Sequence, residues 1–100
     1  MNQTTKMTLL REMKSRRGAN TLILFRNGNS YEAYHADAKI IAKTLSLETF
    51  IDDALDTVRV PASTIEEYVN RLLDVGLAVC VSEMRDEFGN YTPKISTEDE

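Results

Sequence analysis

The feature that most constrains the fold of this chain is a hairpin pattern at Thr21–Tyr34, which reads TLILFRNGNSYEAY. A continuous apolar run is followed by an Asn-Gly turn and then by a run in which aromatic and polar residues alternate. Asn and Gly tolerate the positive φ that tight hairpin turns require, so the pattern predicts two antiparallel strands. The unbroken first run indicates burial on both faces. In the second run, the alternation places Tyr31 on one face of the sheet and Glu32 and Tyr34 on the other.

Periodicity predicts the other elements. Apolar residues at helical spacing predict three helices, at Thr5–Arg17, Asp37–Leu45 and 65–75. Apolar or β-branched runs predict strands at Thr57–Val60 and Leu77–Ser82, with a weaker edge strand at Tyr91–Ile95. Residues 46–56 fit a short helix and an acidic loop equally well. The order of elements predicts an α/β (α+β) fold, in which helices flank a mixed β-sheet.

Three local details follow from the same patterns. In the first helix, Met7 and Leu10 are expected to face the core while Lys6 faces water. Ser63 and Glu66 have the spacing of a capping box, in which each side chain accepts a hydrogen bond from the other residue's amide. Leu73 belongs to the apolar stripe of the third helix and is expected to be buried, with Gly76 ending that helix.

The length and composition predict one domain. One hundred residues suffice for a core without disulfide or metal cross-links, so residues 1–100 are expected to form a single domain, with 96–100 as a disordered acidic tail. No apolar run approaches the roughly 18 residues of a membrane span, and the polar N-terminus lacks the apolar segment of a signal peptide. Cys80 is the only cysteine, so no internal disulfide can form and a cytoplasmic location is expected.

The net charge of −4 is unevenly distributed. Residues 1–26 contain six basic side chains and one acidic side chain, whereas residues 27–100 contain six basic and fifteen acidic ones. This distribution excludes a uniformly basic nucleic-acid-binding protein but allows a local basic face near the N-terminus. A solvated helix face is the simpler interpretation of that cluster.

No catalytic or metal-binding motif is present in the sequence. His35 is the only histidine, so a site with two histidine ligands cannot form, and a surface or capping role is expected for it. Cys80 lies within an apolar run, where a buried thiol is expected. Asp52, Asp53 and Asp56 lack the spacing and the central Gly of a calcium loop. Phosphate-binding and dinucleotide-binding glycine motifs are absent. We therefore expect no enzyme activity, metal, nucleotide or other cofactor.

The hairpin tip is the one candidate binding element. It combines polar and aromatic side chains on a defined turn: Arg26, Asn27, Asn29, Ser30, Tyr31 and Glu32. Hydrogen-bonding and stacking groups on a rigid turn suit insertion into a nucleic-acid groove. They are also common at the exposed end of any soluble hairpin, and the residues alone favour that simpler interpretation.

The stretch LILFRNGNSYEAYHADAKIIAKTLSL resembles the N-terminal mismatch-recognising domain of the MutS family of DNA mismatch repair proteins. The corresponding family stretch reads approximately L-x-x-F-R-x-G-D-F-Y-E-x-F-x-x-D-A-x-x-A-x-x-x-L-x-I. The residues that match are Leu24, Phe25, Arg26, Gly28, Tyr31, Glu32, Asp37, Ala38, Ala42 and Leu45. Pro61–Met84 is similar to a second family block, P-Y-H-A…Y-x-x-K-L-x-x-x-G-x-x-V-A-I-C-E-Q. The resemblance covers about residues 5–86.

The resemblance implies a mixed sheet flanked by helices and a role in contacting DNA in the minor groove. In the family, a Phe wedges beside the mispaired base and a Glu two residues later hydrogen-bonds it. Ser30 stands at the Phe position and Glu32 at the Glu position. A hydroxyl cannot supply the stacking of an aromatic ring on a base, worth about 1–3 kcal/mol. Pro61-Ala62-Ser63 also departs from the family's Pro-Tyr-His, losing both rings.

Two functional hypotheses follow. The first is a stand-alone, non-catalytic module that has lost the mismatch wedge but keeps weak contact with double-stranded DNA through the hairpin tip and the basic N-terminal helix. The second is a protein-interaction or regulatory module that does not bind DNA. The acidic balance of residues 27–100 favours the second.

Overall fold

The computed structural model describes residues 2–82. Its elements, in chain order, are α1 (Gln3–Arg17), β1 (Thr21–Asn27), β2 (Ser30–Tyr34), α2 (Ala36–Leu45), β3 (Phe50–Asp52), β4 (Leu55–Pro61), the 3₁₀ turn η1 (Ala62–Thr64), α3 (Ile65–Asp74) and β5 (Ala78–Ser82). The edge strand expected at 91–95 and the tail expected at 96–100 lie outside the described residues. No helix within the described part of the chain is long and apolar enough to cross a membrane.

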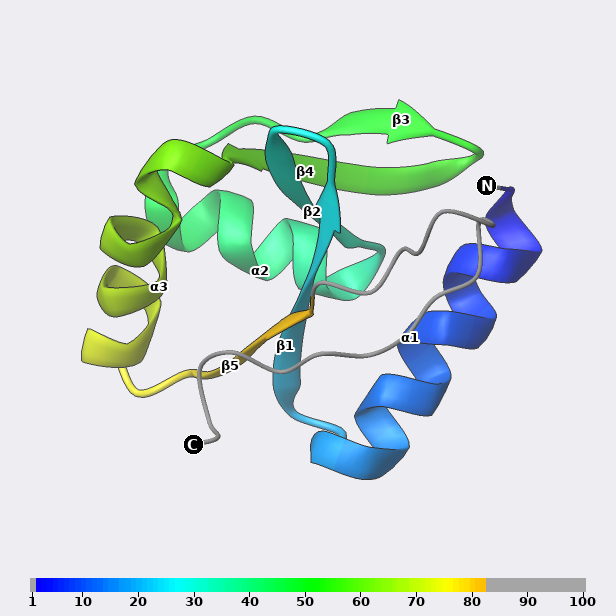
Figure 1. Cartoon of the computed structure of the whole chain (residues 1–100), viewed down its shortest axis with the longest axis horizontal. Helices are drawn as coiled ribbons and strands as arrows, with labels where there is room; N and C mark the ends of the chain where they lie inside the picture. The colour runs from blue at the N-terminus through cyan, green and yellow to red at the C-terminus, as the bar shows by residue number, and fades with distance from the viewer. Residues whose placement is uncertain (1, 83–100) are drawn as a thin grey trace.

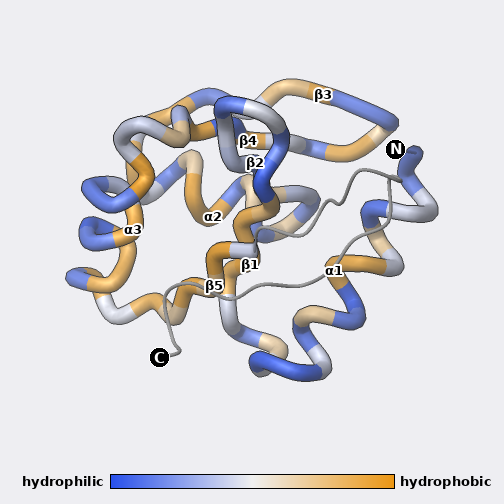
Figure 2. The backbone as a smooth tube through the Cα atoms, viewed as in Figure 1, coloured by the Kyte–Doolittle hydropathy of each residue, from blue (hydrophilic) through white to orange (hydrophobic). Residues whose placement is uncertain are grey.

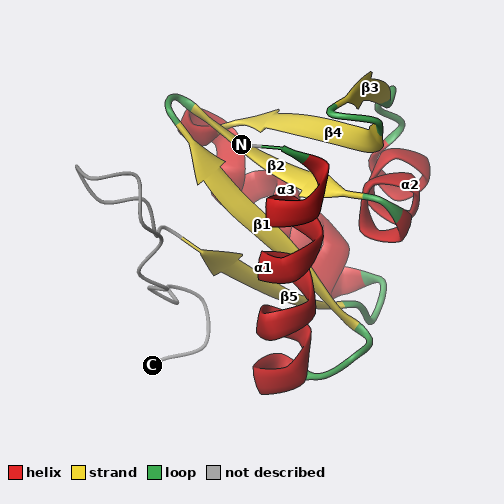
Figure 3. Ribbon diagram, turned by 90° about the vertical axis from the view of Figure 1, so that its right-hand side faces the viewer, coloured by secondary structure: helices red, strands yellow, loops and turns green. Residues whose placement is uncertain are grey.

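The strands form one five-stranded sheet in the order β3-β4-β2-β1-β5. β1 and β5 run parallel, whereas the other neighbouring strands are antiparallel. α1 lies on one side of this sheet, and α2 and α3 cover the other side (Figures 1 and 3). The parallel pair requires a crossover, which α2, the β3–β4 hairpin and α3 provide. The mixed sheet flanked by helices confirms the fold class predicted from the sequence.

β1 is buried on both faces, as its continuous apolar run predicts. Leu22 and Leu24 belong to a core formed with α2 and α3, whereas Ile23 and Phe25 belong to a second core formed with α1. Figure 2 shows the hydrophobic stretches of β1 and β5 at the centre of the molecule, between the helices. The β2 side chains follow the predicted alternation, since Tyr31 lies in the first core and Tyr34 in the second.

The predicted hairpin is confirmed. Asn27 pairs with Ser30, so Gly28 and Asn29 are the two central residues of the turn. Gly28 has a φ of +64° while Asn29 keeps a negative φ, the pattern of a type II′ turn with Gly in its first central position. The Ala62 N–H donates a hydrogen bond to the Asn29 carbonyl at 2.9 Å, so the turn is fixed against η1.

Residues 46–56 form neither of the two structures that the sequence allowed. They contain β3 and the beginning of β4, which pair as a second hairpin. The connecting residues Asp53 and Ala54 have φ values of +52° and +64°, as a type I′ turn requires. The sequence did not indicate this turn because Ala54 occupies a position that Gly usually takes.

Three local predictions about the helices were wrong. Lys6 is only 3% exposed, because its ammonium is paired with carboxylates of the β3–β4 hairpin. Leu73 is 47% exposed at the outer side of α3. Ser63 lies in η1, and the N-cap of α3 is Thr64 without a side-chain capping bond, so the capping box does not form.

The predicted end of α3 at Gly76 is confirmed. Gly76 has a φ of +89°, and its N–H donates to the Leu73 carbonyl at 2.9 Å. The next N–H, from Leu77, reaches back to the Leu72 carbonyl at 3.2 Å. These two bonds form a Schellman motif, in which a residue with positive φ satisfies the last carbonyls of a helix.

A buried carboxylate joins α1, β1 and α2. The β1–β2 ladder pairs only the three residues nearest the turn on each strand. Beyond it, the Ile23 N–H donates to Asp37 Oδ2 at 3.1 Å. Lys14 Nζ donates to Asp37 Oδ1 at 2.8 Å and to the Thr21 carbonyl at 2.6 Å. Asp37 therefore replaces the missing strand partner and holds both helices to β1.

We expect Asp37→Asn to lower the free energy of unfolding by about 2 kcal/mol, because an amide can still accept from Ile23 but cannot balance the Lys14 charge. Urea unfolding followed by circular dichroism measures this loss. Asp74→Asn, an exposed substitution on α3, is the control and is expected to change stability by less than about 0.5 kcal/mol. Equal stabilities for the two variants would contradict the role assigned to Asp37.

Candidate nucleic-acid interface

The hairpin tip presents two exposed amide side chains. Asn27 and Asn29 are exposed, whereas Ser30 is half-buried. Ser30 Oγ donates to the Asn27 carbonyl at 3.2 Å, so its hydroxyl is directed into the turn. Since the Ala62 hydrogen bond also fixes the turn, Asn27 and Asn29 lie on a well-supported end of the sheet.

Arg26 supports the turn from its other side. Its Nε donates to the Gly28 carbonyl at 2.6 Å, and its Nη1 donates to the Tyr31 hydroxyl at 3.2 Å. The guanidinium also lies over the Tyr31 ring, at 5.2 Å from the ring centroid. Tyr31 itself is buried in the core shared with α2 and α3, so its ring is not exposed for stacking.

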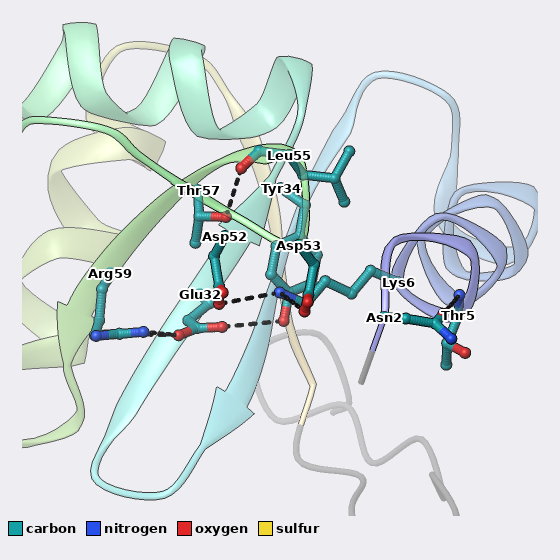
Figure 4. A network of polar contacts seen from close by, with 10 residues as sticks. All are labelled: Asn2, Thr5, Lys6, Glu32, Tyr34, Asp52, Asp53, Leu55, Thr57 and Arg59. Carbon is teal, nitrogen blue, oxygen red and sulfur yellow. Dashed lines mark hydrogen bonds and ion pairs between the residues drawn. The ribbon is translucent and has the colours of Figure 1, made fainter.

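Glu32 lies within the sheet, two residues from the turn. It is 1% exposed, and its Oε2 accepts hydrogen bonds from Arg59 Nε at 2.9 Å and Arg59 Nη2 at 2.5 Å (Figure 4). Its Oε1 accepts a hydrogen bond from the Tyr34 hydroxyl at 3.2 Å. Arg59 was not among the residues that the sequence indicated. Only the β2–β4 register, which places Arg59 opposite Glu32, identifies it.

A second polar cluster ties the start of α1 to the β3–β4 hairpin. Lys6 Nζ lies 3.3 Å from Asp52 Oδ2 and 3.0 Å from Asp53 Oδ2, and 4.7 Å from the centroid of the Tyr34 ring. Burial by itself lowers the pKa of Lys6 and is the largest single effect. The hydrogen bonds and the attraction to Asp53 and Asp52 together outweigh it, so the pKa of Lys6 lies above its ordinary value of 10.5.

Because the pKa of Lys6 is raised, the free energy of unfolding is expected to decrease at alkaline pH. A group whose pKa is raised in the folded state stabilises the fold fully below its unfolded pKa of 10.5. That stabilisation is lost as the pH rises through the higher folded value. We expect Lys6→Met to lower the free energy of unfolding by about 1 kcal/mol at neutral pH, a small loss because both aspartates are partly exposed.

Between pH values of about 10 and 12, the wild type should therefore lose stability towards that of Lys6→Met. Denaturant unfolding at several pH values measures the difference between the two proteins. Lys43→Met, an exposed substitution on α2, is the control. A constant difference between the wild type and Lys6→Met across this range would be inconsistent with the raised pKa.

The basic end of α1 lies far from the hairpin tip. Arg16 and Arg17 end α1 just before β1 begins, whereas the tip is at the other end of β1. Six residue steps of about 3.3 Å separate the two ends of that strand by roughly 20 Å. Figure 1 shows the end of α1 at the bottom and the β1–β2 turn at the top. The structure therefore does not bring these two predicted DNA contacts together.

The surroundings of the tip are not strongly basic. Residues 2–82 contain ten basic and ten acidic side chains. An open cavity of about 390 Å³ lies at the beginning of α3 and is lined by residues 62–67, which include Glu66 and Glu67. η1, which lines this cavity with Ala62, also contacts the turn, since the Ala62 N–H donates to the Asn29 carbonyl. The two carboxylates therefore add negative charge to the side of the molecule on which η1 lies.

The other residues that the sequence analysis considered as possible sites include His35, Cys80 and Asp56. His35 is exposed and stands at the N-cap position of α2, without a capping bond from its side chain. Cys80 is fully buried, and the chain has no second cysteine with which it could form an internal disulfide. Asp56 lies 3.4 Å from Lys39, and no group of three or more metal-ligating side chains occurs between residues 2 and 82.

Comparisons with known proteins give one consistent result. The sequence matches the family model described as MutS domain I over residues 4–93. It is 32% identical over 85 residues to the DNA mismatch repair protein MutS of Chlamydia abortus, covering 85% of this chain and 10% of that protein. It is 28% identical over 68 residues to MutS of Thermotoga petrophila, covering 68% of this chain and 9% of that protein. The chain thus spans about a tenth of the length of these relatives.

Proposed function

The chain belongs to the MutS domain I family, and from this premise we propose that it is a non-catalytic module that contacts double-stranded DNA with its hairpin tip but does not wedge a mismatched base. In MutS, this domain recognises mismatched DNA. The proposal rests on the position of Ser30 in the family pattern and on the hydrogen bond that its hydroxyl makes. Ser30 occupies the wedge position of the family pattern, and its hydroxyl is hydrogen-bonded within the turn.

The loss of the wedge follows from what Ser30 can do. A wedge inserts an apolar side chain between base steps and kinks the duplex, at an unstacking cost that its own contacts offset. Ser30 has neither the length nor the apolar surface for this, and its Oγ is 3.2 Å from the Asn27 carbonyl. The tip can therefore approach the groove, but it gains little from separating two base pairs.

The remaining contact is supported by Asn27 and Asn29. An amide side chain has both donors and acceptors, and the edges of bases in the minor groove present mainly acceptors with one donor. Both amides are exposed on a turn held by the Ala62 and Arg26 hydrogen bonds. Because the turn is already ordered, binding costs little additional conformational entropy.

The charge balance predicts weak, salt-sensitive binding. Sequence-independent affinity for DNA comes mostly from neutralising phosphates with Lys and Arg. Residues 2–82 have no excess of basic side chains, and Glu66 and Glu67 line the cavity next to η1. We therefore expect an affinity at the weak end of non-specific DNA binding.

The first test is a fluorescence-anisotropy titration of a labelled homoduplex at low and high salt. We expect saturable binding with a Kd of about 10⁻⁵ M at low salt, which weakens as salt is added. Arg26→Ala should weaken binding severalfold, because it removes a cation and the support of the Gly28 carbonyl. Arg71→Ala on α3 is the matched control and should leave binding nearly unchanged. No saturable binding at about 100 μM protein in low salt would refute the proposal.

The second test restores the wedge. We expect the wild type to bind a duplex with one mismatch and the matched homoduplex equally. Ser30→Phe should prefer the mismatched duplex by at least about fivefold, because an aromatic–base stack is worth about 1–3 kcal/mol. Competition titrations with the two duplexes measure the ratio. A mismatch preference in the wild type itself would show that Ser30 does not abolish the readout.

A second candidate function, binding to another protein, has one observation in its favour. Ile51 on the edge strand β3 is 68% exposed, and its neighbour Phe50 is exposed as well. An edge strand with apolar side chains can pair with a strand of a partner. The anisotropy titration separates the two functions, because a protein-binding module has no reason to bind DNA in a salt-dependent way.

A further inference from the structure

We propose that Arg59 is a contact for the DNA backbone and that Glu32 is the residue that positions it. This inference rests on the proposed function and adds a residue that neither the sequence pattern nor the resemblance indicated. The resemblance assigned Glu32 to the mispaired base. The geometry of the Glu32–Arg59 pair instead indicates that Arg59 contacts the DNA and that Glu32 holds the Arg59 guanidinium in position.

The Arg59 guanidinium is held by Glu32 and still has N–H groups that can donate hydrogen bonds to a ligand. Glu32 engages its Nε and Nη2, and the Phe50 ring lies 4.8 Å from the centre of the guanidinium. The two N–H groups of Nη1 have no acceptor among the described residues, and the side chain is 48% exposed. A guanidinium fixed on one edge and open on the other is suited to phosphate, because its planar fork matches that geometry and little rotamer freedom remains to be lost.

The position of Arg59 fits a duplex that touches the tip. Ser30 pairs with Pro61 and Glu32 pairs with Arg59, so Arg59 lies on the same face of the sheet as Ser30. Arg59 lies two residue steps along and one strand across from Ser30, a diagonal of about 8 Å between their Cα atoms. Each DNA strand presents a phosphate about every 3.4 Å along the helix axis, so DNA at the tip brings phosphates within reach of Nη1. The basic end of α1 is much farther from the tip.

Glu32 is poorly placed to contact a base. Its carboxylate accepts bonds from Arg59 on one oxygen and from Tyr34 on the other, and it is 1% exposed. A carboxylate released from these partners would also repel phosphate. Within the sheet, it instead determines the direction in which the Arg59 guanidinium points. Glu32 is therefore a positioning residue.

The decisive variant is the double substitution Glu32→Gln with Arg59→Gln. It replaces the ion pair by two amides, so the net charge is unchanged and no buried carboxylate is left without its partner. We expect the Kd for a homoduplex to rise about tenfold, as for the loss of one charge-assisted hydrogen bond. The slope of log K against log salt should become less steep by about 0.9. The matched control, Asp74→Asn with Arg71→Gln at exposed positions of α3, also removes one acid and one base and should change neither quantity.

Glu32→Gln alone tests positioning. It makes the protein more positive by one charge, so a purely electrostatic effect would tighten DNA binding. Loss of the charge-assisted fork should instead weaken binding about threefold while the salt slope stays the same, because Arg59 remains. Arg59→Lys keeps the charge but not the fork and should behave similarly. Tighter binding by Glu32→Gln would overturn the positioning role.

The outcomes separate this inference from the proposed function. If the wild type does not bind DNA, both fail. If the wild type binds DNA, and the double variant and its control share its affinity and salt slope, only the assignment of Arg59 fails. Circular dichroism and a cooperative thermal transition establish that each variant is folded. Should the double variant not fold, Arg59→Lys carries the test, and unchanged affinity in that variant overturns the inference.

Discussion

The arrangement of this domain depends on the buried carboxylate of Asp37. The β1–β2 ladder ends after three residue pairs, and the backbone of β1 would otherwise leave the Ile23 N–H without an acceptor inside the protein. Asp37 supplies that acceptor and takes Lys14 as its counter-charge. A buried ion pair adds little net stability, yet the loss of one partner is costly because the other stays buried. Its main effect here is geometric, since it sets α1 and α2 on opposite faces of the same strand.

The two faces of the sheet are held in different ways. Aliphatic side chains of α2 and α3 pack on one face, where non-directional apolar contacts dominate. On the other face, α1 contributes a few apolar residues between two ion pairs, made by Lys6 near its start and Lys14 near its end. Directional contacts of this kind fix the position of a helix that has only a narrow apolar stripe. They also leave room on this face for the Glu32–Arg59 pair.

The sequence predicted those parts of the fold that depend on neighbours in the chain. The β1–β2 hairpin, the buried stripe of α2 and the end of α3 at Gly76 all follow from local spacing and turn chemistry. Two of the failures have a common cause. Lys6 is buried because Asp52 and Asp53 lie against it in space, and Arg59 is found only from the strand register. Such contacts join residues far apart in the sequence, which periodicity does not record. The β3 strand was missed because its turn uses Ala54 in a glycine-like conformation.

The reactivity of the buried Cys80 thiol can report how often the domain opens. This thiol is the only one in the chain, and it lies fully buried in the core beneath α1, alongside Leu10 and Met13. A thiol reagent can reach its Sγ only when the packing around Cys80 opens, so the rate of modification reports those opening events. Because β5 pairs with β1 along its length, the same rate reports how firmly the strand that carries the hairpin is seated. Ligand contact at the hairpin can thus be followed as a change in reaction kinetics at a distant sulfur atom.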